Sequence, residues 1–220
     1  MAHLTEPALT HSLPRRDRIA ILVALSGLTL LAWIHLIAMA LAMEEMPMSG
    51  AEMMGIHPWS GLDFLLMFLM WAVMMVGMMV PTAVPMTLIY AAVARKGASQ
   101  DTPLAPTATF VLGYIAIWTL FSAAATLVQW WLDQAALLSP MMVSNSPSLG
   151  AGLLIAAGIY QWLPFKDACL QHCRAPAHFF ARHWHTGMAG AFRMGLEHGA
   201  FCLGCCWALM GLLFWGGVMN

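Results

Sequence analysis

Charged residues are scarce in this sequence, and the motifs of several common protein classes are absent. Charged side chains make up 9% of the 220 residues, and nine Lys and Arg nearly balance ten Asp and Glu. Without a basic tail or a basic patch, the chain is not expected to bind nucleic acid. It carries no catalytic triad, phosphate-binding loop or paired carboxylates, which argues against an enzyme, although a metal site between helices could still support redox chemistry.

Hydrophobic residues dominate instead, at 61% of the chain with a mean hydropathy of +0.75. Several apolar runs are long enough to cross the roughly 30 Å hydrocarbon core of a lipid bilayer. We therefore predict an all-α, polytopic transmembrane bundle that forms a single domain over residues 19–220. After a polar leader at 1–18, about five spans are expected, at residues 19–42, 62–94, 107–132, 148–163 and 187–219.

Three of these spans carry further signals. Residues 40–42 resemble a signal-peptidase site, but the apolar run before them is longer than a signal-peptide core, so we expect a retained anchor. Pro81 and Pro85 interrupt the second span and predict a bend, followed by a cytoplasmic extension. The third span carries three tryptophans that we expect as anchors at the membrane surface: Trp118, Trp130 and Trp131.

The basic residues determine the predicted orientation. In the five-span arrangement all nine lie on one side of the membrane, and the positive-inside rule makes that side and the N-terminus cytoplasmic. The protein is thus expected to be a multi-pass protein of a bacterial inner membrane. The nine are Arg15, Arg16, Arg18, Arg95, Lys96, Lys166, Arg174, Arg182 and Arg193.

The same side holds every cysteine of the chain: Cys169, Cys173, Cys202, Cys205 and Cys206. Since the cytosol keeps thiols reduced, metal ligation or catalytic redox chemistry is favoured over structural disulfides. Cys169 and Cys173 are one helical turn apart in the polar, Cys- and His-rich loop 165–186, with His172 between them. Thiolate and imidazole ligands suit copper(I) or zinc(II), but the spacing is not that of a zinc finger.

The start of the fifth predicted span carries metal donors on one helical face. At about 100° per residue, four donors fall within an arc of roughly 100°: His198, Cys202, Cys205 and Cys206. Met194 near the edge of this arc and Glu197 outside it are weaker candidates, and Glu197 is better placed to orient the partners of His198 or to neutralise Arg193. His183 and His185 are weaker candidates for the same metal site.

Small and polar residues in the spans predict close contacts between helices. Four small residues recur every four positions and would let another helix approach closely: Gly187, Ala191, Gly195 and Gly199. The metal donors should therefore face a neighbouring helix instead of lipid. Four polar residues are expected to hydrogen-bond between helices: His35, Gln129, Tyr160 and Gln161.

The chain contains twenty methionines, and their placement is uneven. Thioether sulfur prefers Cu(I) and needs no deprotonation, so a methionine-rich outer loop could capture copper: Met43, Met46, Met48, Met53 and Met54. A second set lies along one face of the second span: Met67, Met70, Met74 and Met78. This stripe, Met74 and Met78 above all, either relays an ion toward the proline bend or only packs against other helices.

Four blocks carry a resemblance to a known family: WAVMMVGMMVPTAVPM, AAGIYQWLPFKDACLQHCRAP, HWHTGMAGAFRMGLEHGAFCLGCCWALM and GGVMN. They are similar to the signature blocks of a bacterial domain-of-unknown-function family described as predicted metal-binding integral membrane proteins. The resemblance covers most of residues 62–220, and it implies a membrane location and a bound metal. It also implies that relatives continue past Asn220 with another apolar segment, which leaves the span count open.

We interpret the sequence as an integral membrane protein that binds a soft transition metal, copper first and zinc second, and takes part in its handling. A metal-accepting protein or a second copy of the chain would be its partner. The inner site would use His198, Cys202, Cys205 and Cys206, with Cys169, Cys173 and His172. Two alternatives stay open: a membrane thiol–disulfide oxidoreductase using two cysteine pairs, and a non-catalytic assembly subunit.

Overall fold

The computed structural model describes residues 13–44, 59–97, 103–135, 147–174 and 176–213. These residues form helices and no strand, which confirms the predicted all-α class. The helices are α2 (Arg15–Glu44), α3 (Gly61–Gly97), α4 (Leu104–Gln134), α5 (Pro147–Gln161), α6 (Pro164–Arg174), α7 (Pro176–His183) and α8 (Gly187–Gly211). The segment 165–186, expected as a loop, therefore consists largely of α6 and α7.

In the part of the chain that the structure describes, three helices are long and apolar enough to cross a membrane. They are Arg15–Ala42, Gly61–Lys96 and Leu104–Gln134, which match the first three predicted spans. A shorter apolar helix, Gly150–Gln161, lies in the fourth. The five-span count and the orientation stay predictions. The outer-loop methionines Met43 to Met54 include Met46, Met48 and Met53, and all but Met43 lie outside the described residues.

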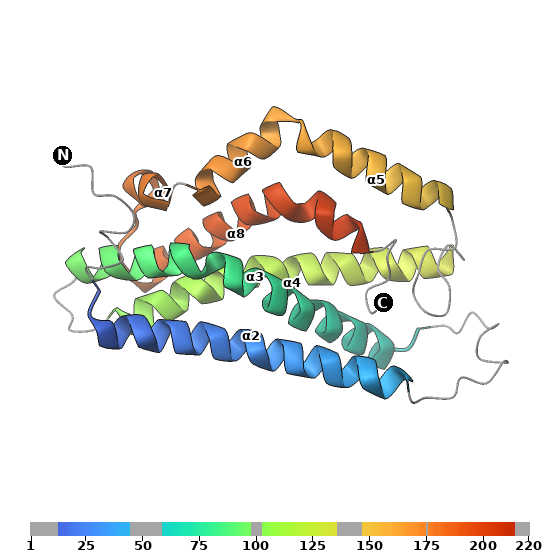
Figure 1. Ribbon diagram of the computed structural model, residues 1–220, viewed down its shortest axis with the longest axis horizontal. Helices are drawn as coiled ribbons and strands as arrows, with labels where there is room; N and C mark the ends of the chain where they lie inside the picture. The colour runs from blue at the N-terminus through green and yellow to red at the C-terminus, as the bar shows by residue number, and fades with distance from the viewer. Residues whose placement is uncertain (1–12, 45–58, 98–102, 136–146, 175, 214–220) are drawn as a thin grey trace.

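The helices pack so that α8, the last helix in the described part of the chain, lies in the middle of the molecule. Helix α3 packs between α2 and α4, and α4 packs in turn on α8. Helices α5 and α6 form an arch over α8 in Figure 1, and both contact it. Helix α8, which carries three of the cysteines, thus lies between α4 on one side and α5 and α6 on the other.

Helix α3 changes direction part-way along its length in Figure 1, and it contains Pro81 and Pro85. A proline removes the amide that would bond to the carbonyl four residues earlier, so Pro81 frees the carbonyl of Gly77. The Trp33 indole N–H donates to that carbonyl across 3.3 Å. The carbonyl that Pro81 frees is therefore satisfied by a side chain of α2.

Helices α4 and α8 approach each other at glycines, as the small-residue spacing predicted. A Cβ atom added at Gly195 would overlap the carbonyl oxygen of Phe110, and one added at Gly113 would overlap that of Phe192. Gly187 has a different role, because it opens α8 at a positive φ of 78° with open space around it. A glycine at this position permits the backbone turn and takes no part in the contact between α4 and α8.

Polar and aromatic side chains within the spans follow the predictions in part. Trp71 donates to the amide oxygen of Gln129 across 2.6 Å, and the Tyr160 hydroxyl donates to the carbonyl of Gly204. Trp118 was wrongly expected at the membrane surface. It is 1% exposed, because its face of α4 meets α3, while Trp131 is 62% exposed. His35 is exposed instead of facing a neighbouring helix.

Candidate metal centre

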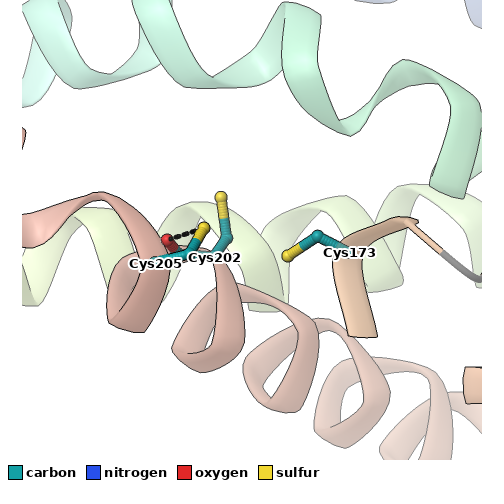
Figure 2. Close-up of side chains that lie close together, drawn as sticks. All are labelled: Cys173, Cys202 and Cys205. Atoms are coloured by element: carbon teal, nitrogen blue, oxygen red, sulfur yellow. Dashed lines mark hydrogen bonds between the residues drawn. The ribbon is translucent and has the colours of Figure 1, made fainter. Parts of the chain in front are cut away.

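Three cysteine sulfurs from two helices converge in the structure. Cys202 and Cys205 lie one turn apart on α8, and Cys173 reaches toward them from α6, as Figure 2 shows. Their three Sγ atoms lie within 4.8 Å of one another. Around one ion with metal–sulfur distances of about 2.3 Å, three sulfurs lie about 4 Å apart, so only a small contraction is needed. We call these residues the thiol trio.

The approach of α6 to α8 depends on a glycine of α8. The Sγ atom of Cys169 lies only 2.9 Å from the position that a Cβ atom would take at Gly204. The hydroxyl of Tyr160, near the end of α5, donates to the Gly204 carbonyl and holds the neighbouring helix against the same turn. A new helix then begins at Pro164, which suits the first turn because it needs no amide donor there. This geometry carries Cys173 to the trio.

The trio lies between a buried side and a more accessible one. Cys202 and Cys205 are 7% and 6% exposed, whereas Cys173 is half-buried. The Cys205 thiol donates to the carbonyl of Cys202 across 3.1 Å. Cys173 is therefore the member through which an ion would enter or leave the trio.

The α6 thiols are held in their neutral form. Contact with Cys202 lowers the pKa of Cys173, but contact with Cys205 and burial outweigh it and raise that pKa to about 12. Burial, and then the nearby Cys205, also raise the pKa of Cys169. A metal must therefore displace a proton from Cys173 in order to bind there.

Two cysteines that the sequence placed in the metal site lie beside the trio instead of within it. The Cys206 sulfur is 3.3 Å from the Cys205 sulfur, but it does not lie close to all three trio sulfurs. Cys169 is buried against Gly204 one turn before Cys173. The Cys206 side chain leaves α8 about 100° around the helix from that of its neighbour Cys205, whereas Cys169 lies on nearly the same face of α6 as Cys173 but one turn earlier along the helix.

His198 lies in an aromatic pocket and not in the trio. Its ring is 3% exposed and stacks with Tyr114 and Phe110 at centroid distances of 5.3 and 6.1 Å. Its Nδ1 atom has no hydrogen-bond partner among the described residues. Met194, one turn earlier, is fully buried among aromatic rings that include Phe110 and Phe179. These two predicted donors extend the buried face of α8 away from the sulfurs.

The other nitrogen and oxygen candidates lie near the surface. His172 and His183 are half-buried on α6 and α7, and His185 lies in the short connection before α8. Glu197 accepts a hydrogen bond from Arg193 Nε across 3.0 Å, which confirms the predicted neutralisation of that arginine. None of these four candidates belongs to the cluster of three sulfurs.

The methionine stripe of α3 packs directly against the thiol region. Met74 is buried in a cluster with Cys202, and Met78 is partly buried at its edge. Cys173 and Cys206 also border this cluster. The stripe therefore places polarizable side chains beside the thiols.

Tyr114 is a site residue that the sequence did not indicate. Its hydroxyl lies 3.3 Å from the Cys202 sulfur and donates to the carbonyl of Met79 across 3.0 Å. It also lies 3.4 Å from the Thr82 hydroxyl. The residue sits in an apolar run of α4, where nothing in the local pattern separates it from a packing residue. Only the rarity of tyrosine, three in the chain, could have drawn attention to it.

Comparison with known proteins agrees with this metal chemistry. Residues 68–220, more than half of the chain, match the family PpoB2, described as copper chaperone. The match includes α4 and α8 and all three residues of the trio. It is consistent with the metal-binding family expected from the sequence blocks. No curated protein and no solved structure matches the chain.

Proposed function

The chain belongs to the PpoB2 copper chaperone family, and from this premise we propose that it is a membrane-integrated chaperone that carries one Cu(I) ion on the thiol trio. The observation that carries the proposal is the convergence of Cys173, Cys202 and Cys205, whose sulfurs lie within 4.8 Å of one another. The ion is cargo, taken up at the trio and passed to a metal-accepting protein.

The donor set favours copper over zinc. Thiolates are soft ligands that select Cu(I), and three of them can surround one Cu(I) ion in a plane. Structural Zn(II) sites are almost always tetrahedral with four ligands. Among the described His, Cys, Asp and Glu residues, the trio gathers three ligand atoms and not four. The family description supports the same choice.

Release of the ion follows from the division of the trio between two helices. Two ligands belong to α8, while Cys173 belongs to the 11-residue helix α6. A partner that displaces α6, or that offers its own thiol beside Cys173, would remove one ligand and weaken the hold of the other two. The half-buried position of Cys173 makes it the point of exchange.

We place the protein in a bacterial inner membrane with five spans and a cytoplasmic N-terminus. Three described helices are long and apolar enough to cross a membrane. Helix α5 and the region of α8 would supply the other two spans. In this orientation the trio lies toward the cytoplasmic side, where thiols stay reduced.

Elemental analysis tests this function. The full chain, purified in mild detergent without chelator or affinity metal, should contain stoichiometric copper. The variant C173S/C202S/C205S should contain no sulfur-bound copper, because serine keeps the size of the side chain but loses the soft donor. Cys169→Ser is the matched control: it alters a buried cysteine of α6 outside the trio and should keep its copper. Sulfur-bound copper retained at full stoichiometry by the triple variant would overturn the assignment.

A further inference from the structure

We propose that His172 and His183 form a second Cu(I) site, a two-nitrogen entry site that loads the thiol trio. This inference rests on the proposed copper-carrying function and adds a place where the ion first binds. The two imidazoles belong to α6 and α7, and their ring centroids lie 6.1 Å apart. Both side chains are half-buried, so they remain within reach of a copper donor in solution.

Each ring presents a free nitrogen of defined identity. His172 Nδ1 lies 2.8 Å from the carbonyl oxygen of Ala168, and His183 Nδ1 lies 3.1 Å from that of Phe179. A carbonyl oxygen can only accept, so in both rings the Nδ1 atom carries the proton. Nε2 is therefore the atom of each ring through which it would bind a metal. A backbone carbonyl on the other ring nitrogen is a common feature of metal-binding histidines.

Aromatic packing holds both rings in place. His172 stacks on Phe201 with a centroid distance of 4.0 Å and an interplanar angle of 6°. His183 stacks on Phe179 at 4.9 Å and 18°. With one nitrogen bonded to backbone and one face against a phenyl ring, each imidazole is fixed before any ion arrives, which lowers the entropy cost of binding.

The separation of the rings suits a shared ion. With metal–nitrogen distances of about 2 Å, two imidazoles on opposite sides of one ion have ring centres about 6 Å apart. The angle of 65° between the rings is compatible with a shared ion, because linear two-coordinate binding does not require the two rings to be coplanar. Cu(I) accepts such two-coordinate binding, whereas Zn(II) prefers four ligands.

Through His172, the histidine pair lies next to the trio in sequence and in space, which suits it to pass an ion to the trio. His172 directly precedes Cys173, the accessible member of the trio, and Phe201 beneath its ring directly precedes Cys202. Two neutral nitrogens hold Cu(I) less tightly than three thiolates do, so the ion moves from the histidine pair to the trio downhill in free energy.

The test uses the full chain in detergent with two phenylalanine substitutions, His172→Phe and His183→Phe, which keep the ring stacking and remove the nitrogens. His178→Phe on the exposed side of α7 is the control. Copper transfer from a coloured Cu(I)–chelator complex is followed by stopped-flow absorbance. We expect the trio of H172F/H183F to acquire copper about tenfold more slowly than that of the control while filling to the same final extent.

A second arm reads the site without the trio. In C173S/C202S/C205S, a weaker Cu(I) equivalent should remain, with nitrogen and no sulfur ligation in X-ray absorption, and it should disappear when the two phenylalanines are added. Equal transfer rates for H172F/H183F and the control, or no residual copper on the histidines, would overturn the entry site and leave the rings as packing groups. Absence of copper from the wild-type trio would instead contradict the proposed function.

Discussion

Helices α2 and α8 are both long and rich in apolar residues, yet they occupy opposite kinds of place in the molecule. Most of α2 is exposed, including Val23, Leu31 and Ile34, and it packs mainly against α3. Helix α8 is covered by α4, α5 and α6, and its residues Ala191 and Met194 are completely buried. Helix α2, which is long and apolar enough to cross a membrane, lies outside, and α8, the helix with three of the cysteines, lies inside.

This difference shows what determines burial in such a protein. In lipid an apolar side chain gains little by turning inward, so close packing and polar contacts decide which helix becomes central. Helix α8 is held by glycine contacts with α4, at Gly113 and Gly195, and by α6 at Gly204. Helix α2 is attached through an ion pair between Asp17 and Arg95 and by smaller contacts.

The largest expected effect is the difference in folding free energy between a methyl group added to α8 and one added to α2. Gly195→Ala on α8 would push a Cβ atom against the Phe110 carbonyl, and overpacking of this kind should cost about 3 kcal/mol or more of folding free energy. Gly27→Ala on α2 meets nothing within 4 Å and should stabilise the helix by about 0.5–1 kcal/mol. Thermal unfolding in detergent, followed by circular dichroism, measures both. Equal melting temperatures for the two variants would contradict the proposed difference in packing between α2 and α8.

The sequence predicted this fold to the extent that helical periodicity carries the information. The apolar runs located α2, α3 and α4, and the four-residue spacing indicated the contact surface at Gly195. The face of α8 correctly included Cys202 and Cys205. Periodicity cannot say what lies opposite that face.

The missing information is three-dimensional. Cys173 completes the trio, and not His198 or Cys206, because the turn before Pro164 and the close approach at Gly204 aim α6 at one side of α8. Tyr114 reaches the site from α4 for the same reason, since only the α4–α8 contact brings its hydroxyl to Cys202. No local pattern in the sequence predicts that Cys173 or Tyr114 contacts the cysteines of α8.

The next largest effect sharpens the comparison within α8 itself. Cys205 and Cys206 are adjacent and chemically identical, but only Cys205 belongs to the trio. Cys205→Ser should weaken Cu(I) binding by about a hundredfold, equivalent to about 2.7 kcal/mol, and Cys206→Ser by only a few fold. Competition with a chelator of known Cu(I) affinity measures both constants. A larger loss of affinity in Cys206→Ser than in Cys205→Ser would show that Cys206, and not Cys205, is the copper ligand.

Copper binding is also expected to depend on pH, in one direction. Although contact with Cys202 lowers the pKa of Cys173, contact with Cys205 and burial raise it to about 12, so the thiol is protonated at neutral pH. Each proton that the metal displaces makes the apparent Cu(I) affinity rise about tenfold per pH unit below that pKa, and fall as the solution is acidified. Chelator competition between pH 6 and pH 8 measures this slope. A flat profile would contradict binding through a neutral Cys173 thiol.

The smallest expected effect compares the two faces of α4, the helix that separates the buried α8 from the outer helices. Tyr114→Phe removes the hydroxyl that lies 3.3 Å from the Cys202 sulfur and donates to the Met79 carbonyl, and should cost about 1 kcal/mol of folding free energy. Thr119→Val removes a hydroxyl from the exposed face of α4, where it bonds only within its own turn, and should be nearly neutral. Because Tyr114 touches a ligand of the trio, its loss should also weaken Cu(I) binding a few fold, whereas Thr119→Val should not. Equal copper affinity in the two variants would show that the tyrosine only holds α3 against α4, and the trio would then owe its geometry to α6 and α8 alone.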